Sequence, residues 1–406
     1  MSPSQESQAV ADSPGVRTSS GVVPVALAGG PKREAQETAF QIPSLDGIRA
    51  ISFLTVFLSH AGLSRLVPGY VGLSVFFFLS GYLITTLLRL EFDKTGNISL
   101  KQFYLRRTLR IFPPLYLVLA VACALPLLGF VRGSVLPGTV AIQAAHLTNY
   151  YIIYKGWWEG IAPGTWVYWS LAVEEHFYLL FPLLYLALKR YVPTGRQQAL
   201  VLLGLCAVVL AWRCGLVFGF HAARDRTYLA TDTRVDAILT GCILAVWRNP
   251  MLDGDSIDDR WLKWVWVPLG ALAFLVSIVV RVPEFEQTFR YTLQSFGLFP
   301  LFIAAIRWHD RGVVRVLNWP LVRRLGVLSY SLYLMHTAAI WAFSERTSWG
   351  ALARGMAAFV TLIVLAALIH RYVERPCARL RRGLARYMEP RREAAAEGRS
   401  SASIAA

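Results

Sequence analysis

The sequence predicts an all-α fold, a polytopic membrane bundle of about ten transmembrane helices with both termini in the cytoplasm. Hydrophobic residues make up 55% of the 406 residues and charged residues only 16%, whereas charged residues are roughly 25% of a soluble domain. The apolar residues form runs near the ~20 residues that a helix needs to cross a bilayer. The basic residues lie mostly between these runs.

Composition divides the chain into three parts. Residues 1–40 are rich in Ser, Gly, Pro, Ala and Gln and contain few large apolar side chains, which predicts a disordered cytoplasmic tail. No apolar stretch follows a basic start near the N-terminus, so we do not expect a signal peptide. Residues 41–380 hold the apolar runs and form the predicted transmembrane domain. Residues 381–406 are predicted to be a second polar cytoplasmic tail.

Ten apolar runs are long enough to be candidate spans. They cover residues 48–66, 70–89, 114–131, 169–188, 199–219, 233–247, 264–281, 291–307, 326–344 and 351–370. Residues 138–154 are an eleventh candidate, but this segment is short and ends in tyrosines. We place it at the membrane interface, where aromatic side chains are enriched.

The basic residues support ten spans. With the N-terminus inside, thirty of the 41 Lys and Arg residues fall in predicted cytoplasmic segments, nine fall outside and two lie within spans. This bias agrees with the positive-inside rule, and an eleventh span at 138–154 would reverse it downstream. The net charge of +16 therefore indicates contact with the lipid bilayer and not a nucleic-acid partner.

The cysteine and histidine patterns indicate no metal site and no permanently bound cofactor. The five cysteines are irregularly spaced and contain no C-x-x-C pair, and most lie in or beside apolar segments. They predict small buried side chains rather than a disulfide framework. The mid-span histidines have no H-x-x-x-H spacing.

The first span carries a polar motif. The sequence SLDGIRA places Asp46 and Arg49 at the predicted inner mouth, and His60 follows Arg49 by eleven residues. Eleven residues of helix span roughly 16 Å, which places His60 near the bilayer centre. An ionisable residue there suggests function, although a hydrogen bond to a neighbouring helix would also explain it. His336, about ten residues into another span, lies at a similar predicted depth.

A basic stretch precedes the third span. Arg106, Arg107 and Arg110 are followed by Pro113 and Pro114, which we expect to begin a new helix. Guanidinium groups match the geometry of phosphates. The same arginines would also serve as ordinary positive-inside anchors, and the residues alone leave both interpretations open.

Other motifs hold charges or small residues inside predicted spans. Glu174 and Glu175 open one span, and a carboxylate beside a membrane histidine can orient its imidazole. Arg234 and Asp236 are two residues apart, so they occupy different helix faces and each needs another partner. Ser80 and Gly81 would allow close helix approach, although simple packing also explains them.

Taken together, these motifs resemble the acyltransferase 3 family of membrane acyltransferases. Six blocks occur in order between about Ser44 and Pro376, and the first has the Arg-x10-His spacing of the family. The blocks are LDGIRA with His60, FFFLSGYL, RRTLRIFPP, WSLAVEEHFY, TDTRVDAILTGC and YSLYLMH. The resemblance implies that His60 is catalytic and that Arg106, Arg107 and Arg110 bind an acyl-CoA donor.

The resemblance implies an O-acyltransferase of the cytoplasmic membrane. It would move an acyl group, expected to be acetyl from cytoplasmic acetyl-CoA, to a hydroxyl of a cell-surface polysaccharide or lipid-linked glycan. His60 would be the general base or be acylated transiently, and Glu174 or Glu175 would hold its imidazole. A supporting polar network would comprise Asp46, Arg49, Arg234, Asp236 and His336.

Two alternatives stay open. The acceptor could be a secondary metabolite such as a macrolide. The protein could also be a transporter, but transporters are commonly built from internal repeats with broken helices. The sequence has no evident repeat, and proline is sparse within the spans.

Topology gives the first testable prediction. Both tails should face the cytoplasm and residues 132–168 the opposite side, because the basic residues are distributed about three to one. In a Cys-free variant carrying Lys155→Cys, an impermeant thiol reagent should label the cysteine only from outside. Labelling only from the cytoplasmic side would contradict the ten-span topology.

Overall fold

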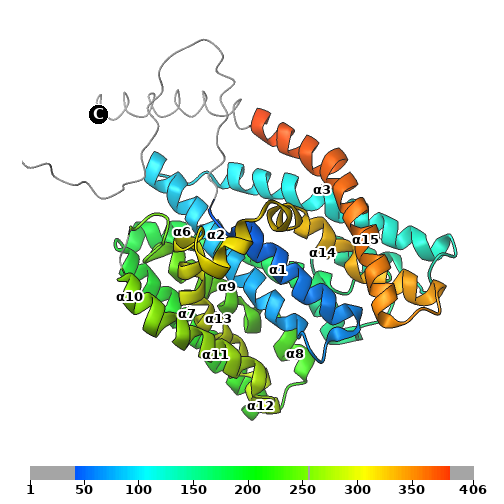
Figure 1. Ribbon diagram of the computed structural model, residues 1–406, viewed down its shortest axis with the longest axis horizontal. Helices are drawn as coiled ribbons and strands as arrows, with labels where there is room; N and C mark the ends of the chain where they lie inside the picture. The colour runs from blue at the N-terminus through cyan, green and yellow to red at the C-terminus, as the bar shows by residue number, and fades with distance from the viewer. Residues whose placement is uncertain (1–41, 255–256, 385–406) are drawn as a thin grey trace, which may run out of the picture. The chain divides into compact units, whose positions relative to one another are not determined.

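The computed structural model describes residues 42–254 and 257–384, and every regular element in these ranges is helical (Figure 1). These described residues form one compact unit. The tail predicted at 1–40 lies outside the described residues, as does nearly all of the tail predicted at 381–406.

Eight helices in the described residues are long and apolar enough to cross a membrane, and each overlaps one predicted span. Six of them are α2 (Gly69–Thr95), α3 (Leu100–Leu127), α6 (Tyr168–Tyr191), α7 (Gly195–Cys214), α13 (Phe289–Arg307) and α14 (Pro320–Arg346). The other two are α11 (Val267–Val279), preceded by α10 (Asp259–Trp261) and η3 (Leu262–Trp266), and α15 (Ala351–Ile369). The all-helical membrane fold is therefore as predicted.

The two remaining predicted spans are helical but shorter. They are α1 (Leu45–Leu58), which continues into the π-helix η1 (Ser59–Leu63), and α9 (Thr231–Val246). The number of ten spans and the side on which the termini lie stay predictions. Residues 138–154 fall in α4 (Pro137–Ala144) and α5 (Thr148–Lys155), eight residues each, too short to cross a bilayer. The short connecting helices are α8 (Arg224–Leu229), α12 (Pro283–Gln287), η2 (Gly215–Gly219) and η4 (Gly312–Asn318).

Helix α3 differs from the sequence prediction. Pro113 and Pro114 lie inside one continuous helix and do not begin it. Proline removes the amides that would bond the carbonyls four residues earlier, but membrane helices tolerate this when neighbouring helices supply donors. Near the two prolines the Tyr330 hydroxyl of α14 donates to the Ile111 carbonyl at 2.7 Å, which ties α3 to α14; the carbonyls that the prolines leave without an amide are those of Leu109 and Arg110.

The last helix also extends further than predicted. The predicted span ends at residue 370, but a π-helical turn, η5 (His370–Glu374), carries the helix past Pro376 to Leu384. In this turn the Arg375 amide donates to the His370 carbonyl five residues earlier. The extension brings its arginines next to the other helices.

Helices α2 and α9 cross with their backbones in direct contact. A Cβ on Gly81 would lie 1.9 Å from the Ile238 carbonyl oxygen, and one on Gly241 would lie 2.0 Å from the Phe78 carbonyl oxygen. Glycine on both helices lets membrane helices approach this closely. The structure thus answers what the sequence left open for Gly81.

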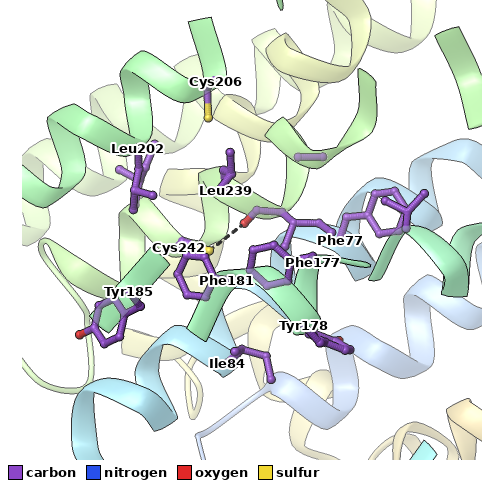
Figure 2. Packing of buried hydrophobic residues seen from close by; sticks show 14 of the residues in the cluster. Phe77, Ile84, Phe177, Tyr178, Phe181, Tyr185, Leu202, Cys206, Leu239 and Cys242 are labelled. Atoms are coloured by element: carbon purple, nitrogen blue, oxygen red, sulfur yellow. Dashed lines mark hydrogen bonds between the residues drawn. The ribbon is translucent and has the colours of Figure 1, made fainter. Parts of the chain in front are cut away.

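An aromatic core surrounds this crossing. Figure 2 shows Phe77 of α2 beside Phe177 and Phe181 of α6, with Cys242 of α9 next to them. Phe177 and Phe181 stack with ring centroids 4.6 Å apart. Cys206 and Cys242 are fully buried here and unpaired, as predicted for small apolar side chains.

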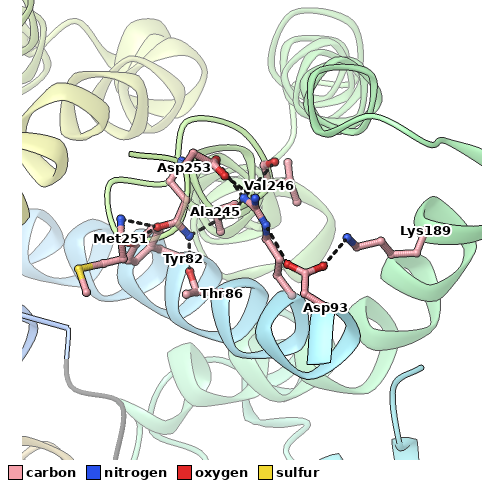
Figure 3. A network of polar contacts seen from close by, with 10 residues as sticks. Tyr82, Thr86, Asp93, Lys189, Ala245, Val246, Met251 and Asp253 are labelled. Carbon is pink, nitrogen blue, oxygen red and sulfur yellow. Dashed lines mark hydrogen bonds and ion pairs between the residues drawn. The ribbon is translucent and has the colours of Figure 1, made fainter. Parts of the chain in front are cut away.

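A polar network fastens α2 to the end of α9 (Figure 3). Arg89 donates to the Ala245 carbonyl at 3.1 Å, at the C-terminal end of α9, and also pairs with Asp253. Basic groups at this end of a helix satisfy carbonyls that have no intrahelical donor. Asp93 extends the network to Lys189 at the end of α6.

The glycine crossing leads to a stability prediction. Gly81→Ala should lower the melting temperature and abundance of the detergent-solubilised protein, since overpacking costs about 1–3 kcal/mol and here the obstacle is backbone. Gly204→Ala in α7 is the matched control, because no atom lies within 4 Å of the position of its added Cβ. Equal melting temperatures for the two variants would contradict the close crossing.

Candidate active site

Two predicted site histidines, far apart in the sequence, meet in the fold. Nδ1 of His60 lies 2.9 Å from Nε2 of His336. His60 lies in the π-helical η1, and His336 lies within α14. The His60 side chain is exposed, whereas His336 is fully buried. Single π-helical turns are frequent at functional sites.

Direct packing of α1 against α14 brings the pair together (Figure 1). A Cβ on Gly326 of α14 would lie 1.8 Å from the Asp46 carbonyl oxygen of α1. Further along the same two helices, the Phe53 ring meets the His336 ring edge-on, with centroids 6.2 Å apart. Glycine at 326 therefore sets the spacing at which His60 reaches His336.

The bonding partners fix the tautomers of both histidines. His336 Nδ1 lies 2.7 Å from the Tyr333 carbonyl, which only accepts, so His336 Nδ1 carries a proton. No carboxylate contacts His336 in the described part of the chain, and an unpaired buried charge is costly, so its ring is neutral. His336 Nε2 must then accept from His60 Nδ1. This leaves a lone pair on Nε2 of His60, the property that a general base or nucleophile needs.

A cavity of about 330 Å³ lies beside the histidine pair. Helices α1, α2, α3, α6 and α14 and the extension of α15 form its walls. Its lining holds nine Asp, Glu and Arg residues, namely Asp46, Arg49, Arg107, Arg110, Glu174, Glu175, Glu374, Arg375 and Arg381. His370 lines the cavity too and contacts Glu374 at 2.6 Å.

Six of the predicted site residues line this cavity. Within it, Arg49 pairs with Asp46 at 3.0 Å. The Tyr178 hydroxyl donates to Glu174 at 3.0 Å, one helical turn away on α6, and the Arg107 guanidinium lies 5.1 Å from the centre of the Tyr178 ring. The cavity thus gathers both predicted carboxylates of α6 with two of the three arginines predicted to bind a donor.

Other predicted contacts do not form. Glu174 accepts a hydrogen bond from Tyr178, and the ring nitrogen of His60 contacts His336 instead of a carboxylate. Arg106 pairs with Glu91 at 2.7 Å and does not line the cavity. Because Arg106 and Arg107 are adjacent, they point to different sides of α3.

Arg234 and Asp236 lie apart from the cavity. As their spacing predicts, they do not pair with each other. Asp236 forms a buried ion pair with Arg213 of α7 at 3.0 Å, and the Arg234 guanidinium stacks 3.7 Å from the centre of the Tyr291 ring of α13. Both residues connect helices and do not line the cavity.

Tyr333 is the link between the cavity and the histidine pair, and the sequence analysis did not single it out. Its side chain lines the cavity, its ring lies 5.2 Å from the His336 ring and its carbonyl holds His336 Nδ1. Its hydroxyl lies 2.6 Å from the Ser170 hydroxyl. Tyr333 precedes His336 by three residues and so lies on the same helix face, and this spacing could have identified it as a site residue.

Arg375, Arg381 and Glu374 also line the cavity without having been predicted to do so. The span predicted at 351–370 stops short of all three residues, so they were not among the predicted site residues. In residues 42–254 and 257–384, no three His, Cys, Asp or Glu side chains are grouped so as to hold a metal ion.

Several curated bacterial proteins are similar to this chain. A putative O-acetyltransferase of Staphylococcus aureus is 31% identical over 74% of this chain and 50% of its own length. The peptidoglycan O-acetyltransferase OatA of Listeria monocytogenes is 27% identical over 85% of this chain and 57% of its own length. A putative peptidoglycan O-acetyltransferase of Bacillus subtilis is also 27% identical, over 82% of this chain and 54% of its own length.

The chain spans about half the length of these curated relatives. No solved structure matches it. The acyltransferase domain that defines the acyltransferase 3 family matches residues 42–371, which include the histidine pair and most of the cavity lining. The chain therefore belongs to the acyltransferase 3 family.

Proposed function

We propose that this protein is a membrane O-acetyltransferase that moves an acetyl group from acetyl-CoA to a hydroxyl of a cell-envelope glycan. The observation that carries the proposal is the position of the charged cavity. Tyr333 lines this cavity, and its carbonyl accepts a hydrogen bond from His336. His336 in turn contacts Nδ1 of His60 and leaves Nε2 of His60 with a free lone pair. The family match and the O-acetyltransferases among the relatives support the same reaction class.

The cavity suits a donor that is anionic at one end and neutral at the other. Arg110 is exposed and Arg107 half-buried, whereas Ser170 and Tyr333 are 2% and 8% exposed. A phosphate group would bind near the arginines, since guanidinium and phosphate form charge-assisted hydrogen bonds. The neutral arm of acetyl-CoA would then extend inward and direct the thioester toward Tyr333.

Glu174 and Glu175 receive a different role from the one predicted for them. Both line the cavity, and in the described part of the chain neither forms a hydrogen bond with His60. Ionised carboxylates only accept hydrogen bonds, so they are suited to the amide N–H groups in the arm of the donor. We assign donor phosphate binding to Arg107 and Arg110, and we leave Arg106 with Glu91.

His60 would carry the chemistry. Its Nε2 takes the proton of the acceptor hydroxyl while the hydroxyl oxygen bonds to the acetyl carbon. The carbon–sulfur bond then breaks, and the proton passes to the sulfur of the departing CoA. In the alternative route the same nitrogen attacks the thioester first, and CoA leaves as the thiolate. The acceptor hydroxyl then attacks the acetyl group on His60, the nitrogen–carbon bond breaks, and the proton of the hydroxyl passes to the thiolate. In both routes the His60–His336 hydrogen bond orients the ring.

The acceptor is the less defined partner. Two relatives are named as actual or putative peptidoglycan O-acetyltransferases, which favours a peptidoglycan-type glycan within the broader class of envelope glycans. A chain in the cytoplasmic membrane would meet acetyl-CoA on its cytoplasmic side. The exposed His60 is then the group that the acceptor hydroxyl must reach.

Replacing His60 tests this function. In nanodisc-reconstituted protein with acetyl-CoA and a peptidoglycan fragment, His60→Ala should reduce acetyl transfer at least about a hundredfold at normal protein abundance. His309→Ala is the control, because His309 is an exposed histidine outside the cavity lining. Near-normal turnover in His60→Ala would refute the mechanism, and absence of acetyl transfer in the unmodified protein with several glycans would refute the function.

His336 should act by positioning His60. The amide oxygen of Gln can accept a hydrogen bond from His60 Nδ1, whereas Leu cannot. We expect His336→Leu to lower kcat by about tenfold or more, and His336→Gln to retain a larger share of kcat, at equal abundance and melting temperature. Equal losses in both folded variants would contradict the tautomer assignment.

A further inference from the structure

The helical extension of α15 presents arginines in two directions. Arg375 and Arg381 line the cavity, together with Cys377 and Ala378. Arg379 and Arg382 belong to the same segment but are exposed and do not line the cavity. One face of the extension is therefore part of the cavity wall. Arg379 and Arg382 carry the same positive charge but lie outside the cavity lining.

The carboxylates of the cavity do not neutralise these arginines. Asp46 pairs with Arg49, while Glu374 accepts from Ser331 at 2.5 Å and contacts His370 at 2.6 Å. Across residues 42–254 and 257–384, no ion pair joins a carboxylate to Arg375 or Arg381. The same holds for the two arginines of α3 in the cavity, Arg107 and Arg110.

Four arginines thus converge on one cavity, and among the described residues none of them forms an ion pair with a carboxylate. Like charges held close together in a partly buried site repel each other, and an anion between them relieves that repulsion. Guanidinium groups form paired hydrogen bonds to phosphate oxygens. CoA carries three phosphate groups, so arginines beyond the two on α3 would have phosphate oxygens to bind.

We propose that Arg375 and Arg381 bind phosphate groups of the donor, so that the extension of α15 is one wall of the donor site. This inference rests on the proposed function and adds a donor-binding element outside the motifs of the sequence. An anionic lipid headgroup offers the same phosphate chemistry. The position of both arginines in a cavity that also contains Glu174 and Tyr333 favours the donor.

Paired substitutions on this one segment provide the test. Arg375→Gln and Arg381→Gln would be compared with Arg379→Gln and Arg382→Gln, which remove the same charge from the other face. Each variant would be reconstituted in nanodiscs of phosphatidylcholine, which has no net charge. The substrates would be acetyl-CoA and acetyl-pantetheine, a thioester donor without phosphates.

Loss of either cavity arginine should raise KM for acetyl-CoA about tenfold with little change in kcat. KM for acetyl-pantetheine should not change, and the two control variants should match the unmodified protein. An equal rise with acetyl-pantetheine would overturn the proposal, because the effect would not depend on phosphate. Equal effects in Arg379→Gln or Arg382→Gln would also overturn it.

Two further measurements show whether the bound phosphate belongs to the donor or to a lipid. If the KM effect occurs only after addition of phosphatidylglycerol, the phosphate belongs to lipid and the proposal is wrong. Calorimetric titration with adenosine 3′,5′-bisphosphate measures binding without acetyl transfer. Binding that is lost in Arg381→Gln supports the inference even if the unmodified protein proves inactive as an acetyltransferase. Unchanged binding in both cavity variants contradicts it.

Discussion

Backbone contact at glycine sets the positions of the helices that form the candidate site. Gly326 lets α14 meet α1 at the Asp46 carbonyl, and Gly81 and Gly241 let α2 meet α9. In lipid, helix association depends on close packing because the lipid tails are as apolar as the side chains. A methyl group at any of these glycines would push its two helices apart. At Gly326 the shift would separate α14 from α1, and a 2.9 Å contact between His60 and His336 would not survive it.

Ionisable groups are placed in two different ways within this bundle. Arg213 and Asp236 are fully buried and paired, and they join α7 to α9. Around the cavity, by contrast, several arginines are partly exposed and form no ion pair with a carboxylate in the part of the chain that the structure describes. Paired charges between helices stabilise a fixed arrangement, whereas unpaired charges beside a cavity indicate a ligand. This contrast distinguishes the arginine that joins helices from the arginines that we propose to bind the donor.

Much of the fold could be predicted, because the length of an apolar run and the positions of basic residues report directly on membrane insertion. The error at Pro113–Pro114 came from applying a rule for the first turn of helices to a membrane helix, which can hold proline in its interior. The sequence identified His60 and His336 separately. Their hydrogen bond could not be predicted, because it depends on how α1 packs on α14. Likewise, only the packing of α3 separates Arg107 in the cavity from Arg106 beside Glu91.

Tyr333 has a consequence for the membrane itself. Its ring contacts His336, its side chain lines the cavity, and its hydroxyl is held by Ser170, while His60 is not part of the cavity lining. A transferase that uses this arrangement need not open a continuous aqueous pore between donor and acceptor. The proton gradient would be preserved during turnover, and water would have little access to the thioester. Such an enzyme could exchange chemical groups between two compartments without exchanging ions.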